Sequence, residues 1–136
     1  MTGITHSRSE AHGTRAFDRP LRAIVALSVL VSAAVHLWLW WFADFRSIDW
    51  IGPLFLLNAV AGVALAVVVV VWRHWLPVLA AIGFGLATLV AFVLSATVGL
   101  LGVNEVWSGG PQLTAGIAEI VTVVGGALVL AREHRP

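Results

Sequence analysis

Four long apolar runs dominate this sequence, and each could cross a lipid bilayer as a single helix. They cover approximately residues 23–42, 53–72, 76–101 and 113–131. A helix needs about 20 predominantly apolar residues to cross the hydrocarbon core. Inside lipid the backbone must satisfy its own hydrogen bonds, which a helix does within one segment. The sequence therefore predicts an all-α fold, a four-helix transmembrane bundle.

The segments between the runs have the composition of turns, and both ends of the chain are polar. Gly and Pro punctuate the longest connection, GVNEVWSGGPQ, and the short RHWLP stretch predicts a tight turn. The first run is too long for a cleaved signal peptide, so it predicts an uncleaved helix. We expect residues 1–20 to form a flexible cytoplasmic tail, residues 21–132 a four-helix transmembrane domain, and residues 133–136 a second cytoplasmic tail.

The arginines predict how the helices are oriented. Arg46 lies in a connection on one side, whereas the other seven of the eight basic residues flank the opposite ends of the runs. Cytoplasmic loops of membrane proteins carry an excess of basic residues. Both termini are therefore expected in the cytoplasm, with the protein crossing the plasma membrane several times.

The tryptophans fall where the runs would meet the lipid headgroups. Indole combines an apolar body with one N–H donor, which suits this boundary. We expect them to form an interfacial belt at each side of the membrane: Trp38, Trp40, Trp41, Trp50 and Trp107 at the outer side, and Trp72 and Trp75 at the inner side.

Each run also carries small or polar residues at helical spacing. Ser32 and His36 in the first run are four residues apart and share a face. Comparable stripes pass through Asn58, Thr88 and Glu119 in the later runs. Small residues let helix backbones approach, and polar residues hydrogen-bond between helices. We expect these stripes to face one another inside the bundle.

Three of these residues, His36, Asn58 and Glu119, form the candidate site. A helical rise of about 1.5 Å per residue places each of them roughly 4–6 Å to the outer side of its run's midpoint. An ionised carboxylate at such a depth costs several kcal/mol. Glu119 should therefore be neutral or have a donor, for which His36 and Asn58 are available. Glu105 is expected in an outer loop, where it could form the mouth of the same cavity.

The sequence leaves four interpretations of this cluster open. It could lock helix packing, handle a proton or ion, ligate a metal or cofactor, or consist of residues that never meet. A haem with two axial histidines needs both at one depth, whereas His74 lies at the opposite boundary from His36. No cofactor is therefore expected, and metal binding stays undecided.

Several functional classes are excluded by residues that are missing. The chain contains no cysteine, which excludes disulfides, thiolate metal sites and thiol catalysis. Walker, Rossmann, nucleophile-elbow and HExxH motifs are absent. Basic residues form no stripe outside the helix flanks, so nucleic acid is not an expected partner. We expect a protein that is not an enzyme.

The segments HLWLWW…IGPLFLLNAVAGVALAV, TVGLLGVNE and IAEIV resemble small four-helix membrane proteins of unknown function from high-GC Gram-positive bacteria (actinobacteria). The likeness covers nearly all of the chain after Arg22, and its motif positions would be His36, Pro53, Asn58, Gly99, Glu105 and Glu119. The resemblance implies the fold and a location in a bacterial plasma membrane, as a multi-pass protein, and it implies no particular activity. The chain is also similar in size to small multidrug resistance transporters, but their membrane glutamate lies in the first helix.

The leading functional expectation is a non-catalytic accessory or assembly subunit of a cell-membrane complex. Its expected partners are the lipid bilayer and other membrane-protein subunits or further copies of this chain. The alternative is a small proton- or ion-coupled transporter, with Glu119 as the titrating group and His36 as its partner. A third hypothesis is a metal- or haem-binding redox membrane protein.

Overall fold

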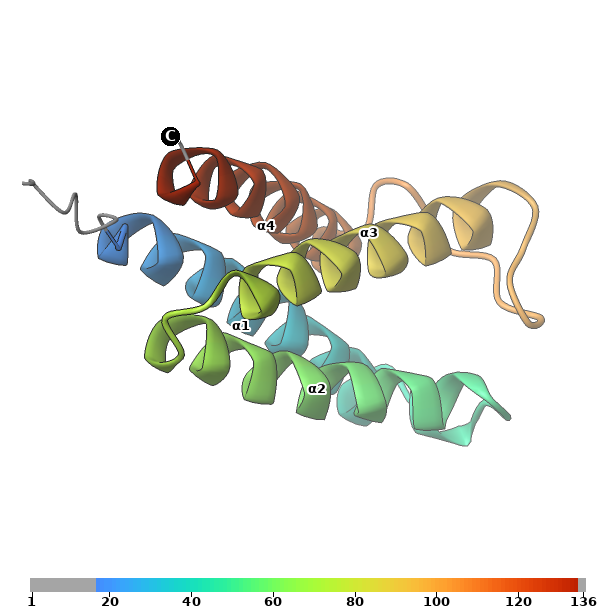
Figure 1. Ribbon diagram of the computed structural model, residues 1–136. Helices are drawn as coiled ribbons and strands as arrows, with labels where there is room; N and C mark the ends of the chain where they lie inside the picture. Colours follow the sequence, from blue (N-terminus) through green and yellow to red (C-terminus); the bar gives the residue numbers. More distant parts are fainter. Residues whose placement is uncertain (1–16, 135–136) are drawn as a thin grey trace, which may run out of the picture.

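The computed structural model describes residues 17–134, and this range folds into four long α-helices joined by short connections (Figure 1). They are α1 (Arg19–Phe42), α2 (Ile51–Val71), α3 (Trp75–Thr97) and α4 (Gly110–Glu133), with a short 3₁₀ helix, η1 (Phe45–Ser47), after α1. Each of the four is long and apolar enough to cross a membrane. The predicted all-α four-helix fold is confirmed, and it is compatible with a small multi-pass membrane protein; the orientation of the termini stays a prediction.

The helix ends are set by local chemistry that hydropathy does not report. α1 begins at Arg19, inside the tail expected over residues 1–20, because Asp18 caps it by accepting a hydrogen bond from the N–H of Leu21 at 3.1 Å. α3 ends at Thr97, short of the expected residue 101. The chain turns there through Gly99, which has a φ of +83° that glycine adopts without strain. Residues 1–16 and 135–136, which hold most of the two expected tails, lie outside the described part of the chain.

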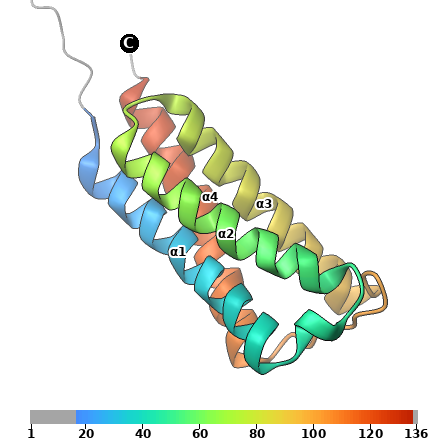
Figure 2. The ribbon, with the colours of Figure 1, turned by 90° about the horizontal axis from the view of Figure 1, so that it is seen from below.

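Two ends of the bundle can be distinguished, and these names are kept below. The terminal end holds the start of α1, the turn at residues 72–74 and the end of α4; the loop end holds the connections at residues 43–50 and 98–109. α2 packs mainly on α1, and α3 packs mainly on α4, while α1 and α4 also pack on each other. α2 and α3 meet at the terminal end and spread apart toward the loop end (Figures 1 and 2).

Small residues produce the tight helix pairs. A Cβ added at Gly62 would lie 2.8 Å from the Cβ of Ala33, so α2 and α1 are in close contact there. A Cβ added at Gly85 would lie 3.1 Å from the backbone oxygen of Glu119, which places α3 against α4. The buried faces therefore follow the small and polar stripes, as their spacing predicts.

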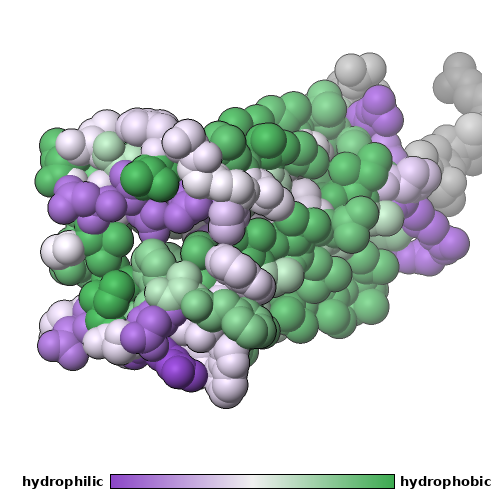
Figure 3. Space-filling model, turned by 180° about the vertical axis from the view of Figure 1, so that it is seen from behind, coloured by the Kyte–Doolittle hydropathy of each residue, from purple (hydrophilic) through white to green (hydrophobic). Residues whose placement is uncertain are grey.

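The outer surface of the bundle is apolar between two polar ends. In the space-filling view, hydrophobic residues form a broad middle zone, hydrophilic residues gather at both ends, and the loop end is hollowed (Figure 3). Many large apolar side chains are exposed on the helices, for example Leu57 and Ile117, each 62% exposed. An apolar surface of this extent is what contact with lipid chains requires.

Candidate binding cavity

A cavity of about 400 Å³ lies between α2 and α3 in the half of the bundle nearer the loop end. It exists because those two helices diverge, and α1 and α4 form its wall on the side away from the gap between α2 and α3. All four α-helices contribute residues to its wall. The three residues of the predicted cluster, His36, Asn58 and Glu119, all line it, and so does Glu105.

Glu119 is the most deeply buried ionisable side chain of this cavity, at 2% exposure. Its Oε1 accepts a hydrogen bond from the hydroxyl of Ser32 on α1 at 3.2 Å. Within the described part of the chain its Oε2 has no hydrogen-bond partner, since the hydroxyl of Thr88, which lies near Glu119, donates to the backbone oxygen of Phe84 at 2.8 Å. Among residues 17–134 no arginine or histidine forms an ion pair with it. An ionised carboxylate is very unfavourable in such surroundings, so the geometry favours the protonated acid until a cation is present.

His36 approaches Glu119 only through Ser32. The Nδ1 of His36 lies 2.8 Å from the backbone oxygen of Ser32, and because that oxygen can only accept, Nδ1 carries the hydrogen. The neutral ring then has its lone pair on Nε2. The ring also contacts Phe55, with 5.0 Å between the ring centres. The donor to Glu119 is thus Ser32 and not His36, and the described residues contain no hydrogen bond or ion pair that joins His36, Asn58 and Glu119 directly.

Asn58 supplies a second unpartnered oxygen. Its Oδ1 is buried without a hydrogen-bond partner, as is Oε2 of Glu119. Buried polar atoms in folded proteins nearly always have a partner, so two orphaned oxygens on the residues of one cavity need an explanation. A bound molecule with hydrogen-bond donors provides one.

Glu105 lies at the loop-end side of the cavity. Its Oε2 accepts a hydrogen bond from Nε2 of Gln112 at the start of α4, at 2.8 Å. The backbone of the same loop is held to α3, since Ser95 donates its hydroxyl hydrogen to the backbone oxygen of Val103 at 3.0 Å. Glu105 therefore lines the cavity from this loop, and its role as the mouth stays a prediction.

The rest of the cavity wall is mostly apolar. Three phenylalanines contribute to it, Phe55 from α2 and Phe84 and Phe92 from α3. Within residues 17–134 no group of three or more histidine, cysteine, aspartate or glutamate side chains could hold a metal ion. The cavity therefore suits an organic ligand better than a coordinated metal.

The tryptophans lie at the two ends of the bundle where the sequence places them. Six of them are at least 41% exposed, and Trp40 is half-buried. Their place in an interfacial belt stays a prediction, and none of them lines the cavity.

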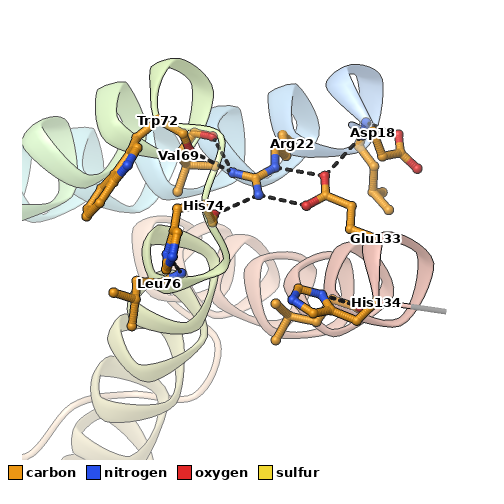
Figure 4. A network of polar contacts seen from close by, with 10 residues as sticks. Asp18, Arg22, Val69, Trp72, His74, Leu76, Glu133 and His134 are labelled. Carbon is orange, nitrogen blue, oxygen red and sulfur yellow. Dashed lines mark hydrogen bonds and ion pairs between the residues drawn. The ribbon is translucent and has the colours of Figure 1, made fainter. Parts of the chain in front are cut away.

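A second buried polar network, at the terminal end, was missed from the sequence (Figure 4). Arg22 of α1 is 1% exposed and forms a two-pronged ion pair with Glu133 of α4, at 2.9 and 2.7 Å. Its other N–H groups donate to the backbone oxygens of Val69, Trp72 and His74 at the α2–α3 turn, at 3.0, 3.2 and 2.8 Å. The signal available in the sequence was an arginine one turn inside the first helix and a glutamate at the end of the last, both on the same side of the bundle.

Comparison with models of protein families, with curated proteins and with solved structures finds no match to this chain. The geometry of the cavity therefore carries the functional proposal. The resemblance to small actinobacterial membrane proteins stays a prediction.

Proposed function

We propose that this chain is a small proton- or ion-coupled membrane carrier, in which Glu119 binds or releases a proton or ion as a substrate leaves or enters the same cavity. Glu119 itself carries the proposal. Its carboxyl group is 2% exposed in the wall of a cavity of about 400 Å³, and within residues 17–134 it has one hydroxyl donor and no cationic partner. Such a carboxyl is stable as the acid, and it is stable as the anion only when a cation arrives. A proton and a cation then compete for the carboxyl group of Glu119. Binding of one releases the other, and this competition is the basis of coupled exchange.

This arrangement favours a carrier over a packing device. A buried polar group that only specifies packing is stabilising when all of its atoms have partners, and partly satisfied networks are unfavourable. Glu119 leaves Oε2 without a partner and borders an open space. The accessory-subunit hypothesis stays a prediction, and the cavity does not support it, because docking to another subunit needs no internal space.

Proton movement in reconstituted vesicles tests the proposal. The protein is placed in liposomes that contain a pH-sensitive dye, and three compounds with the same naphthylpropyl body are added outside: a guanidinium, a urea and a sulfonate. At least one of them should change the internal pH in wild-type vesicles. Glu119→Gln should abolish this change, because an amide keeps the size of the side chain and carries no exchangeable charge. Thr114→Val, on the exposed face of the same helix and outside the cavity, is the control that should behave as wild type.

If none of the three compounds moves protons through the wild-type protein, the carrier proposal is wrong. Pull-down of the tagged protein from its own membranes in a mild detergent, followed by mass spectrometry, then tests the accessory-subunit hypothesis. Recovery of a larger complex in fixed stoichiometry would support that hypothesis.

A further inference from the structure

We infer that the substrate of this cavity is an amphipathic organic cation, with an ammonium or guanidinium head that carries N–H donors and an apolar body. This inference rests on the carrier proposal and names its substrate class. Three properties of the cavity carry it: its hydrogen-bonding imbalance, its charge, and its apolar wall.

The hydrogen-bonding imbalance is an excess of acceptors. The two buried oxygens without partners among the described residues are Oε2 of Glu119 and Oδ1 of Asn58. The amide oxygen of Asn58 can only accept, and so can both oxygens of Glu119 once that residue has released its proton. The ring of His36 uses its Nδ1 hydrogen on the backbone of Ser32, so the neutral ring adds a third acceptor at Nε2. A ligand that satisfies these groups must bring N–H or O–H donors, and a charged N–H donor forms the stronger hydrogen bonds.

The charge of the wall points to a cation. Two carboxyl groups, those of Glu105 and Glu119, line the cavity, and none of the arginines within residues 17–134 does. The arginine that is buried in the bundle, Arg22, uses its guanidinium on Glu133 and three backbone oxygens at the terminal end. An anionic ligand would lie beside two carboxyl groups with no positive charge to offset them. A cationic ligand would instead provide the positively charged partner that ionised Glu119 needs.

The apolar wall determines the body of the ligand. Phe55, Phe84 and Phe92 offer aromatic faces, which attract both apolar groups and cations. Leu57 and Ala87 line the cavity and are also exposed on the outer surface of α2 and α3. The cavity is therefore continuous with the apolar surface of the bundle, and a molecule that partitions into lipid can reach it from the side.

Direct binding of the three naphthylpropyl compounds to the purified protein in lipid nanodiscs tests the inference. The guanidinium should bind at least about tenfold more tightly than its neutral isostere, the urea, because a hydrogen bond between charged groups is stronger than one in which a partner is neutral. The sulfonate should bind more weakly than both.

Glu119→Gln should reduce the preference for guanidinium over urea to about twofold or less, and Asn58→Asp should increase guanidinium affinity by adding a carboxylate. Circular dichroism confirms that each variant is helical, and Asn58→Asp decides the question if Glu119→Gln does not fold.

The results separate this inference from the carrier proposal. Equal binding of the guanidinium and the urea, or tighter binding of the sulfonate, overturns the cation as substrate class. Proton movement driven by the sulfonate or the urea alone would keep the carrier and also overturn the cation. Tight, Glu119-dependent binding of the guanidinium without proton movement would support the cation as ligand and overturn the carrier.

Discussion

Arg22 and Glu119 are both buried, but they differ in how far the surrounding groups satisfy their hydrogen bonds and charge. A guanidinium has five N–H donors, and Arg22 has a hydrogen bond for each of them. Two of its acceptors lie at the end of α2, where helix carbonyls lack partners within the helix: the backbone oxygen of Val69 in the last turn and that of Trp72 directly after it. Glu119 has one donor for two oxygens. Arg22 is therefore fully satisfied within the fold, whereas Glu119 keeps one oxygen free, as the carrier proposal requires.

Replacing Arg22 should destabilise the bundle strongly. Arg22→Gln leaves Glu133 buried without its ion pair, and we expect a loss of about 3–5 kcal/mol in the free energy of unfolding. Arg22→Lys should recover less than half of this, since an ammonium cannot reach the carboxylate and three backbone oxygens together. Chemical unfolding in detergent micelles measures both. Arg132→Gln is the control: Arg132 is 60% exposed in its ion pair with Asp18, so the loss should stay below about 1 kcal/mol. An equal loss for the two arginines would contradict this account of Arg22.

Asp18 should make the stability of the protein depend on pH. Hydrogen bonds from the backbone N–H of Leu21 and from Arg132 hold the pKa of Asp18 below its ordinary value. A lowered pKa stabilises the folded state above the unfolded pKa of about 4, and this contribution is lost as the pH falls through the folded value. The unfolding temperature of wild type should therefore exceed that of Asp18→Asn at about pH 7, and the gap should close toward about pH 3. A gap that stays constant over this range would show that the charge of Asp18 contributes nothing.

At the scale of the helices, the sequence predicts which segments are helical, but it does not predict which helices pack closely and which diverge. The apolar runs and the stripes of small residues indicate four helices and their buried faces, because both depend on local composition and the helical period. The ends of α1 and α3 depend on a cap at Asp18 and a turn at Gly99, which an apolar count does not include. α2 and α3 diverge because each packs closely on a different helix: Gly62 allows close approach of α2 to α1, and Gly85 allows close approach of α3 to α4. Such pairings are set by three-dimensional contacts, so a single sequence does not reveal them.

Enlarging Gly62 should separate α1 from α2. In Gly62→Ala the new methyl group would lie 2.8 Å from the Cβ of Ala33, which is too close and belongs to a side chain that cannot rotate away. We expect a loss of about 1–3 kcal/mol in the free energy of unfolding. Gly83→Ala is the matched control on α3, where a Cβ meets nothing within 4 Å, so the better helix propensity of alanine should raise stability by about 0.5–1 kcal/mol. A stabilising effect at both glycines would mean that α1 and α2 are not in close contact.

The whole molecule is closed at one end and open at the other. At the terminal end the network of Arg22 and Glu133 joins α1, α4 and the α2–α3 turn, whereas the loop half holds the cavity. The sequence predicts that His36, Asn58 and Glu119 lie at similar depth, and the structure places them in one cavity. It could not predict that Ser32 is the donor to Glu119, because that depends on how α1 is rotated about its own axis where it packs on α4.

Access from the side of the bundle should depend on small residues between α2 and α3. Ala87→Trp would place an indole at the opening of the cavity, whereas Ala80→Trp adds the same group to the exposed face of α3 away from it. We expect the first variant to slow association of the naphthylpropyl guanidinium by about tenfold and the second to leave it unchanged. Stopped-flow fluorescence measures both rates. Equal rates in both variants would show that the ligand enters from the loop end instead.

The unfolding temperature of Glu119→Gln in detergent tests the central claim most directly. Glutamine keeps the length of the side chain and the acceptor that Ser32 uses at 3.2 Å, and it removes only the ionisable group. If the role of Glu119 is to bind a ligand, burying its carboxyl group lowers the stability of the fold. The variant should then unfold at the same temperature as wild type or at a higher one. If Glu119 instead locks the helices together, the variant should unfold more than about 4 °C lower, which corresponds to roughly 1 kcal/mol, and that result would contradict the account.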